Sequence, residues 1–454
     1  MTSVIVRPRR ISPDGVILPP PTAPSRRILK HPRLMHYNRL IVFVLAMNAA
    51  FFVVALTRGG WWHRNSIALG AIGITAQSNF ALAIIVRQQY VINFVCKLAT
   101  SAPTSWPLRI RWSLAKVYHF GGLHVGAAIS GTLWYIAFVG SLIYMYARGG
   151  GNVWPANVAV SGTLVTLFVV MVVMAVPPLR ARAHDRFEIT HRFCGWAALL
   201  LVWVNTVLFA ASQRGDRSMA AALLHAPTIW IIAVTTVLAA FPWLLLRRVP
   251  ITVHRPSRHV ALIGFDHGVT PFIGSSRPIS RNPLLGWHSF ANVPDPARPG
   301  GYRMAVSRAG DWTAAFIDNP PTHVWIRGIP TAGMANVRKL FKKVVFVATG
   351  SGIAPMLAHL LANELPGHLV WVTRSPRKTY GDGLVDEILT AQPDATIWNT
   401  DEDGKPDMVR LVYAAYVNSG AEAVICIANR KVTWQVVHGM EQLGIPACGP
   451  IWDS

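Results

Sequence analysis

Six apolar stretches, each close to the length of a bilayer-spanning helix, constrain the fold of this chain more than any other feature. They run over residues 40–56, 66–86, 117–146, 158–176, 193–211 and 229–246. A helix needs about 20 apolar residues to cross the hydrocarbon core of a membrane. None of the six has the charged face that a long helix of a water-soluble bundle would carry. They therefore predict a polytopic α-helical membrane bundle of six spans over residues 39–248.

The composition agrees with a membrane location and argues against a nucleic-acid partner. Charged residues make up 14% of the chain and hydrophobic residues 52%, whereas soluble proteins are about a quarter charged. The net charge of +23 would suit a nucleic-acid binder, but this hydropathy would not. We interpret the excess of Lys and Arg as attraction to an anionic leaflet and to phosphorylated ligands.

Basic residues are concentrated in alternate loops, which predicts the orientation of the bundle. They gather in residues 1–38, 87–116 and 177–192, and directly after the last span at Arg247 and Arg248. The loops on the opposite side carry fewer. Basic loops stay on the cytoplasmic side, so we expect an integral membrane protein whose N- and C-termini are both cytoplasmic. Residues 1–38 are basic and proline-rich, and we expect them to form a disordered tail.

Histidines at membrane depth are candidates for haem ligation, because a haem iron can take one imidazole from each side. His119 and His124 lie near the start of the third span, and His184 and His191 near the start of the fifth. His119 and His124 point roughly 140° apart on a helix, so only one of them can face the iron. We expect His124 and His191 to be the ligands of at most one b-type haem, with His119 as the alternative to His124. Hydrogen bonding of these histidines to lipid headgroups or helix carbonyls is the competing interpretation.

The remainder of the chain predicts two cytoplasmic domains. Residues 249–335 contain short runs rich in Thr, Val, Pro and Gly, which are typical of a small β-barrel. Residues 336–454 alternate strands with helices and predict a doubly wound α/β domain, whose ligands bind at the carboxyl ends of the strands. The strands are expected at 344–348, 369–373, 396–398 and 423–428, and the helices at 355–363, 384–391, 407–419 and 432–443.

A glycine turn in the α/β domain is the strongest local candidate for a phosphate site. The buried strand Val344–Ala348 leads through Gly350, Ser351 and Gly352 into a helix with Pro355 in its first turn. Backbone N–H groups at such a turn point outward and can bind a pyrophosphate. An ordinary turn between strand and helix is the alternative.

Four motifs stand out in this chain: Thr190-His191, Trp287-His288-Ser289-Phe290-Ala291, Ala309-Gly310-Asp311-Trp312-Thr313 and Gly350-Ser351-Gly352-Ile353-Ala354-Pro355. They resemble motifs of the ferric reductase and NADPH oxidase superfamily, whose cytoplasmic half is similar to ferredoxin–NADP reductases. The length and C-terminal end also resemble the fungal TmpA-type integral membrane oxidoreductases.

The resemblance implies roles for individual residues. Trp287, His288, Ser289 and Phe290 would form the FAD-binding segment, and Gly328, Thr331 and Gly333 would belong to a turn that holds the FAD pyrophosphate. Gly350, Ser351, Gly352 and Pro355 would hold NADPH or NADH. Arg374, with Arg377 and Lys378 nearby, would pair with a 2′-phosphate and favour NADPH; a solvated loop is the alternative. Cys426 would lie beside the nicotinamide, or simply fill a buried strand, and Trp452 would stack on the flavin.

These features predict an enzyme: a membrane-bound, flavin-dependent NAD(P)H oxidoreductase. It would pass electrons through FAD to one inner-side haem or to an unidentified acceptor at the membrane face. Family members with two haems carry a second histidine further along each span, where this chain has Leu133 or Phe138, and Asn205. A transmembrane ferric reductase or superoxide-generating oxidase is therefore the less favoured alternative. A non-catalytic membrane sensor of NAD(P)H is another.

Overall fold

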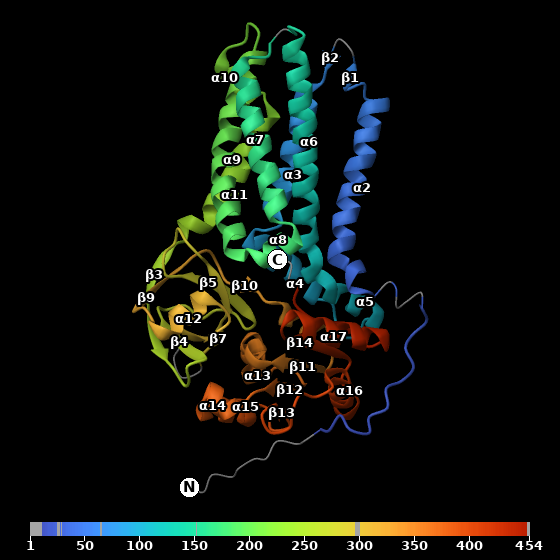
Figure 1. Cartoon of the computed structure of the whole chain (residues 1–454), viewed down its shortest axis with the longest axis vertical. Helices are drawn as coiled ribbons and strands as arrows, with labels where there is room; N and C mark the ends of the chain where they lie inside the picture. Colours follow the sequence, from blue (N-terminus) through green and yellow to red (C-terminus); the bar gives the residue numbers. More distant parts are fainter. Residues whose placement is uncertain are drawn as a thin grey trace.

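A bundle of upright helices stands over two β-containing domains that lie side by side at one of its ends (Figure 1). The computed structural model describes residues 11–24, 28, 30–63, 66–150, 152–295 and 300–451. The segment that precedes the bundle and the strand that follows it both lie at the end where these two domains are found. This arrangement places the N-terminal segment and the C-terminal domains on the same side of the bundle, as the basic loops predict.

The bundle consists of long apolar helices joined by shorter ones. By length and composition, five helices in the described ranges could cross a membrane, or six if one bent pair is counted as a single span. Their aromatic core includes Trp134, Tyr135 and Phe138, which pack with Leu164 and Phe168. The helices are α2 (His36–Thr57), α3 (Leu69–Ile85), α4 (Gln89–Thr100), α5 (Leu108–Leu114), η2 (Ala115–Gly121), α6 (Gly122–Ala147), α7 (Pro155–Met174), α8 (Pro177–Arg182), α9 (His184–Gln213), α10 (Met219–Leu224) and α11 (Pro227–Leu244).

The bent pair is α3 and α4, which meet at 69°. The last turn of α3 tightens, so that the Arg87 amide bonds to the Ile84 carbonyl at 3.2 Å instead of to the Ala83 carbonyl that a regular helix would use. The Ala83 carbonyl is thereby released from the helix. Beyond the bend, α4 runs along the base of the bundle and contacts the β-domain.

The β-domain is antiparallel and follows α11 directly. Its strands lie in the order β10-β5-β9-β3-β4-β8-β7, and β6 also pairs with β5. Phe265, Tyr302, Phe316 and Ile326 belong to its buried core. The predicted small β-domain is thus confirmed, with the elements β3 (Arg247–His254), β4 (Val260–Asp266), β5 (Ser275–Ser280), β6 (His288–Ala291), β7 (Val293–Pro294), β8 (Gly301–Ser307), α12 (Asp311–Asp318), β9 (His323–Ile326) and β10 (Thr331–Ala332).

The C-terminal domain is a doubly wound α/β domain, as predicted. Its five parallel strands have the order β13-β12-β11-β14-β15, so the topological switch point lies between β11 and β14. One face of the sheet is covered by α13 and α15, and the other by α16 and α17. The elements are β11 (Val344–Thr349), η4 (Gly350–Ile353), α13 (Ala354–Ala362), β12 (Gly367–Thr373), α14 (Pro376–Tyr380), α15 (Asp382–Ala391), β13 (Thr396–Asn399), α16 (Met408–Ser419), β14 (Ala423–Ile427), α17 (Arg430–Gln442) and β15 (Ala447–Cys448).

The described part of the N-terminal tail is packed on the α/β domain, in contrast to the disorder expected for residues 1–38. Ile11 is buried in the core on the α16–α17 side of the sheet. The Thr22 amide donates to the Gln442 carbonyl at 2.8 Å. The ring of His31 lies 5.8 Å from that of His438, between centroids. These contacts make residues 11–24 and 30–35 a strap between the α/β domain and α2.

Two ion pairs join the bundle to the sheet. Arg111 of α5 is 4% exposed and donates to Glu422 at 2.7 Å and to the Leu340 carbonyl at 2.7 Å. Lys116 of η2 contacts Glu441 of α17 at 2.5 Å. A buried guanidinium is costly without its partner charge, so the Arg111–Glu422 pair favours the observed docking of the two domains.

Glu422→Gln should destabilise the protein by about 2 kcal/mol at neutral pH, because it leaves Arg111 without a counter-charge. The Arg111 guanidinium lowers the pKa of Glu422 below its ordinary value of 4.5. The stabilisation is therefore present above about pH 4.5 and is lost as the pH falls through the lowered pKa. Thermal unfolding of the detergent-solubilised protein at pH 7 and at acidic pH would measure both effects. The exposed Glu402 offers a matched control, and an equal loss of stability in Glu402→Gln would contradict the prediction.

Candidate functional site

The predicted glycine turn lies at the switch point of the parallel sheet. β11 ends at Thr349, η4 carries Gly350, Ser351 and Gly352, and α13 begins at Ala354. The side chain of Ser351 is exposed at this edge. The strand, turn and helix are therefore confirmed, and they meet where a doubly wound fold binds ligands.

Close packing explains why glycines occupy this turn. A Cβ atom on Gly352 would lie 1.9 Å from the carbonyl oxygen of Ile427, at the end of β14. Gly350 has a φ of +49°, a conformation that most other residues adopt only with strain. The turn thus lies against the neighbouring strand end, with the Ser351 side chain exposed.

Two aromatic residues that the sequence did not indicate, Trp371 and Tyr380, pack beside the turn. The indole of Trp371 donates to the Gly350 carbonyl at 3.0 Å. Tyr380 packs against Trp371 with ring centroids 4.9 Å apart, and burial raises its pKa to about 12. Tyr380 therefore stays protonated at neutral pH and acts as a packing residue here.

The basic residues after β12 have different environments. Arg374 is 84% exposed and contacts Asp401 at 3.2 Å. Arg377 is engaged with Asp382 at 2.9 Å and Asp386 at 2.7 Å. Arg374 is therefore the better placed of the two to receive a phosphate, although Asp401 competes for it.

Cys426 does not face the nucleotide turn. It is fully buried, and its side chain belongs to the core between the sheet and α16–α17. Successive residues of a strand point to opposite faces, and Ile425 and Ile427 belong to the core on the other side of the sheet. Burial raises the pKa of the Cys426 thiol to about 12. This environment favours the alternative in which Cys426 fills a buried strand, and its catalytic role stays a prediction. Trp452, the other predicted catalytic residue, lies outside the described residues.

In the predicted flavin segment, residues 287–290, one aromatic residue contacts the bundle and two rings lie against Trp312. Trp287 is buried beneath Arg327, whose guanidinium lies 4.6 Å from its ring, and its ring lies 6.2 Å from that of Trp243 in α11. His288 and Phe290 share one face of β6 and both lie against Trp312, with centroid distances of 4.1 and 6.2 Å. Trp287 thus anchors the segment to the bundle.

The side chain of Ser289 is exposed on the opposite face of β6 from His288 and Phe290. Burial lowers the pKa of His288 below its ordinary value, so this imidazole is neutral at pH 7. The segment therefore presents a neutral, largely aromatic surface on one face and a hydroxyl on the other.

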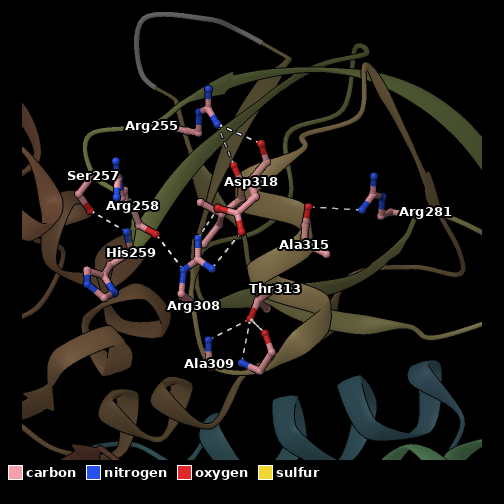
Figure 2. A network of polar contacts seen from close by, with 12 residues as sticks. Arg255, Ser257, Arg258, His259, Arg281, Arg308, Ala309, Thr313, Ala315 and Asp318 are labelled. Atoms are coloured by element: carbon pink, nitrogen blue, oxygen red, sulfur yellow. Dashed lines mark hydrogen bonds and ion pairs between the residues drawn. The ribbon is translucent and has the colours of Figure 1, made fainter.

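Trp312 lies in the first turn of α12, and side-chain contacts fix both ends of this helix (Figure 2). The Thr313 hydroxyl accepts hydrogen bonds from the Ala309 and Gly310 amides at 2.9 and 3.1 Å. At the other end of α12, Arg308 pairs with Asp318. The Gly-Asp-Trp-Thr motif thus forms a helix start, with Trp312 half-buried in its first turn.

The turn that should hold a pyrophosphate is instead bound by α4. The side-chain oxygen of Gln89 accepts from the Ile329 amide at 2.9 Å and lies where a Cβ on Gly328 would be. The side-chain oxygen of Asn93, one helical turn further, accepts from the Ala332 amide at 2.7 Å. Two amides of this turn are therefore already used by the protein.

The remainder of the turn is also engaged. Gly333 donates its amide to the Gly274 carbonyl at 2.8 Å, and its own carbonyl accepts from the Tyr118 hydroxyl at 2.6 Å. Thr331 pairs with Ser276 of β5. The structure therefore does not support the predicted pyrophosphate role of Gly328, Thr331 and Gly333. It assigns the turn to docking against α4. The polar residues Gln89 and Asn93, one helical turn apart on α4, could have indicated this from the sequence.

The bundle brings His124 and His191 together. Their ring centroids are 6.5 Å apart. The His124 Nδ1–H donates to the Ala83 carbonyl at 2.9 Å, the carbonyl that the bend after α3 releases. His119 lies elsewhere: its Nδ1 accepts from the Tyr37 amide and its ring faces His36. The structure thus favours His124 over His119 as the partner of His191.

The chain is similar in sequence to fungal adenylate-forming reductases. Residues 334–454 match the C-terminal domain of adenylate-forming reductase 03009. Over 94% of its length, the chain is 39% and 38% identical to the adenylate-forming reductases 03009 and 06235 of Coprinopsis cinerea. It spans 41% of the length of each relative. The similarity to ferric reductases stays a prediction, because neither of these relatives carries that name.

The similarity to solved structures is weak. A phthalate dioxygenase reductase has a TM-score of 0.35 at 20% identity, covering 45% of this chain and 67% of its own. A ferredoxin-NADP+ reductase from Plasmodium falciparum has a TM-score of 0.34 at 12% identity, covering 45% and 94%. These scores are too low to define a fold, so the assignment of the two domains rests on their own strand order.

Gly352→Ala should destabilise the α/β domain, because the added methyl group collides with the Ile427 carbonyl. We expect a loss of more than about 2 kcal/mol, typical of an overpacked rigid site. Gly383→Ala in α15 is the matched control, because a Cβ there meets open space, and it should be neutral or slightly stabilising. Thermal unfolding of both variants tests the prediction. Equal midpoints would show that the turn has room for a side chain.

Proposed function

We propose that this chain is an NAD(P)H-dependent flavoprotein reductase, held in a membrane by its helical bundle with both termini on the cytoplasmic side. Its electrons would leave through a haem between His124 and His191. The observation that carries the proposal is the glycine turn pressed against the end of β14 at the switch point of a parallel sheet. The names of the two fungal relatives, which are called reductases, support the reaction class.

The residues of the turn fit a dinucleotide. Gly350 and Gly352 allow the turn to adopt its conformation against β14, and the exposed Ser351 hydroxyl would be available to a bound pyrophosphate. The N-terminus of α13 adds a favourable partial charge. Arg374 would pair with a 2′-phosphate in place of Asp401, which favours NADPH over NADH.

The β-domain fits the flat ring of a flavin better than the charged part of FAD. His288, Phe290 and Trp312 offer a neutral, aromatic surface suited to a ring system. The turn Gly328–Gly333 has its amides engaged, so the pyrophosphate of FAD would need other donors. When bound, FAD accepts a hydride from a nicotinamide and releases electrons singly.

The histidine pair fits a haem better than a simple metal ion. Two imidazole nitrogens bound to one metal lie about 2 Å from it, and a centroid separation of 6.5 Å accommodates that arrangement. Among the described residues, no group of three or more His, Cys, Asp or Glu side chains could hold a metal. A macrocycle would have to complete the coordination. The bond from His124 Nδ1 to Ala83 leaves its Nε2 free as a ligand.

Direct contacts link the flavin segment to the helix that carries His191. Arg192, the next residue of α9, donates to the carbonyls of Leu284 and Leu285. These lie just before Trp287 and His288 in sequence. The contacts of Arg192 therefore hold the proposed flavin site and the proposed haem site on neighbouring elements. Electron transfer over a short distance requires such proximity.

The alternative of transfer across the whole membrane is disfavoured by the position of Asn205. Its side chain is buried, accepts from Ser161 at 2.8 Å and donates to the Tyr135 hydroxyl at 3.2 Å. Phe138, the corresponding position on α6, is buried beside Phe209. A second haem would need ligands that these side chains do not provide. A ferric reductase or oxidase that passes electrons across the membrane through two haems is therefore the second candidate.

An absorption spectrum of the detergent-purified protein, before and after NADPH under argon, tests the proposal together with a pyridine-haemochrome count. We expect flavin bleaching and one b-type haem per chain. His124→Ala and His191→Ala should each lose the haem while flavin bleaching persists, and His119→Ala should keep both.

Other results would change the assignment. Two haems per chain would restore transmembrane transfer. Flavin without haem would move the acceptor to the cytoplasmic face of the membrane. A folded protein with neither flavin nor haem would favour the non-catalytic sensor.

Arg374→Gln should raise the KM for NADPH by roughly tenfold to a hundredfold, since it removes a charge-assisted contact to phosphate. The KM for NADH should stay nearly unchanged. Steady-state rates with each nucleotide and an artificial electron acceptor measure the ratio. Arg377→Gln is the control, because Arg377 is already paired with two carboxylates. Equal effects on both nucleotides would remove Arg374 from the 2′-phosphate site.

A further inference from the structure

The loop between β5 and β6 exposes two adjacent leucines. Leu284 and Leu285 are 56% and 54% exposed. A single exposed leucine is ordinary on a protein surface, but apolar groups that gather there usually mark a binding surface. The side chains of these two leucines have no part in the nucleotide, flavin or haem sites described above.

The backbone of this loop is bound to the bundle. The Arg192 guanidinium of α9 donates to the carbonyls of Leu284 and Leu285. Trp287, which follows the loop, lies 6.2 Å from Trp243 of α11 between ring centroids. The loop therefore lies against the ends of α9 and α11 that face the β-domain (Figure 1).

These contacts lie at the level where α9 changes from charged to apolar. Residues 184–192 of α9 are rich in charged side chains, whereas its apolar stretch begins at Phe193. α11 ends at Leu244, and Trp196 of α9 lies 5.4 Å from Trp243 between ring centroids. If the bundle spans a membrane, as proposed above, both helices leave the hydrocarbon at this level, and the loop lies beside that boundary.

Apolar side chains also line the bundle surface at this level. Phe193, Trp196 and Leu244 are exposed there, and the rings of Phe193 and Trp196 lie 5.4 Å apart between centroids. Tryptophans of membrane proteins gather where the hydrocarbon meets the headgroups. Arg247 and Arg248 are exposed directly after α11, as expected beside an anionic cytoplasmic leaflet.

We propose that Leu284 and Leu285 insert into the cytoplasmic leaflet, so that the β-domain contacts the bilayer directly as well as through the bundle. This inference rests on the membrane location proposed above. Removing the two side chains from water is favourable, and Arg192 holds their backbone at the level of the leaflet. The insertion would keep the flavin segment, which begins at Trp287, at a fixed height relative to His191.

The test is spin labelling of the full-length chain in lipid nanodiscs. Accessibility of the label to oxygen, which concentrates in lipid, is compared with accessibility to a water-soluble nickel chelate. Labels are attached at Leu284→Cys or Leu285→Cys in a Cys194→Ala background, because the other three cysteines are buried. Both leucines are exposed, so the variants should fold normally.

We expect the oxygen-to-nickel accessibility ratio to be several-fold higher at Leu284 and Leu285 than at His254→Cys. His254 is the matched control, because it is an exposed residue of the same domain at the end of β3 that is farther along the chain from α11. A label at Leu200→Cys reports on the bundle itself, since Leu200 is 65% exposed on α9, one turn beyond Trp196.

A ratio at both leucines as low as at His254, together with a high ratio at Leu200, would overturn the proposal and leave the membrane location standing. A low ratio at Leu200 as well would show that the membrane location has failed, and the proposal with it. Labels at Leu284 and Leu285 that are shielded from both reagents would indicate a protein partner on the loop, which would also overturn the proposal.

Discussion

The break between α3 and α4 is the feature on which the meeting of the two halves depends. A continuous helix would keep the Ala83 carbonyl inside the helix and would carry Gln89 and Asn93 straight on beyond the base of the bundle. The 69° bend releases that carbonyl to orient His124, and it lays α4 along the base. Gln89 and Asn93 then hold the chain just before β10 and within it, by the amides of Ile329 and Ala332. One local interruption thus positions both a partly buried imidazole and the β-domain.

Ion pairs also hold the α/β domain against the bundle, and they form at the few positions where a carboxylate is present. The chain has 43 basic and 20 acidic side chains, so few carboxylates are available to neutralise cations at the junction. Glu422 and Glu441 are used by Arg111 and Lys116, the two cations that reach from the bundle to the sheet.

The comparison of expected and observed sites shows which inferences depend on local pattern. The glycine turn, its strand and its helix follow from a few consecutive residues, and the structure confirms them. The roles of Cys426 and of the Gly328–Gly333 turn were assigned from a resemblance, and the structure gives both a different environment from the one expected. Cys426 is buried in the core on the α16–α17 side of its sheet, and two amides of the turn are bound by a helix more than 200 residues earlier. The pairing of His124 with His191 needed both helix periodicity and the observed packing.

The sequence by itself determined the apolar helices, the antiparallel domain that follows them and the alternating strands and helices of the last domain. These depend on hydrophobic periodicity and glycine positions, which act over short stretches of chain. Only the tertiary structure decided the bend between α3 and α4, the strap formed by residues 11–24 and 30–35, and the choice of His124 over His119. Each of these arises from contacts between segments far apart in sequence, and local pattern carries no information about which distant side chain will complete a hydrogen bond or an ion pair.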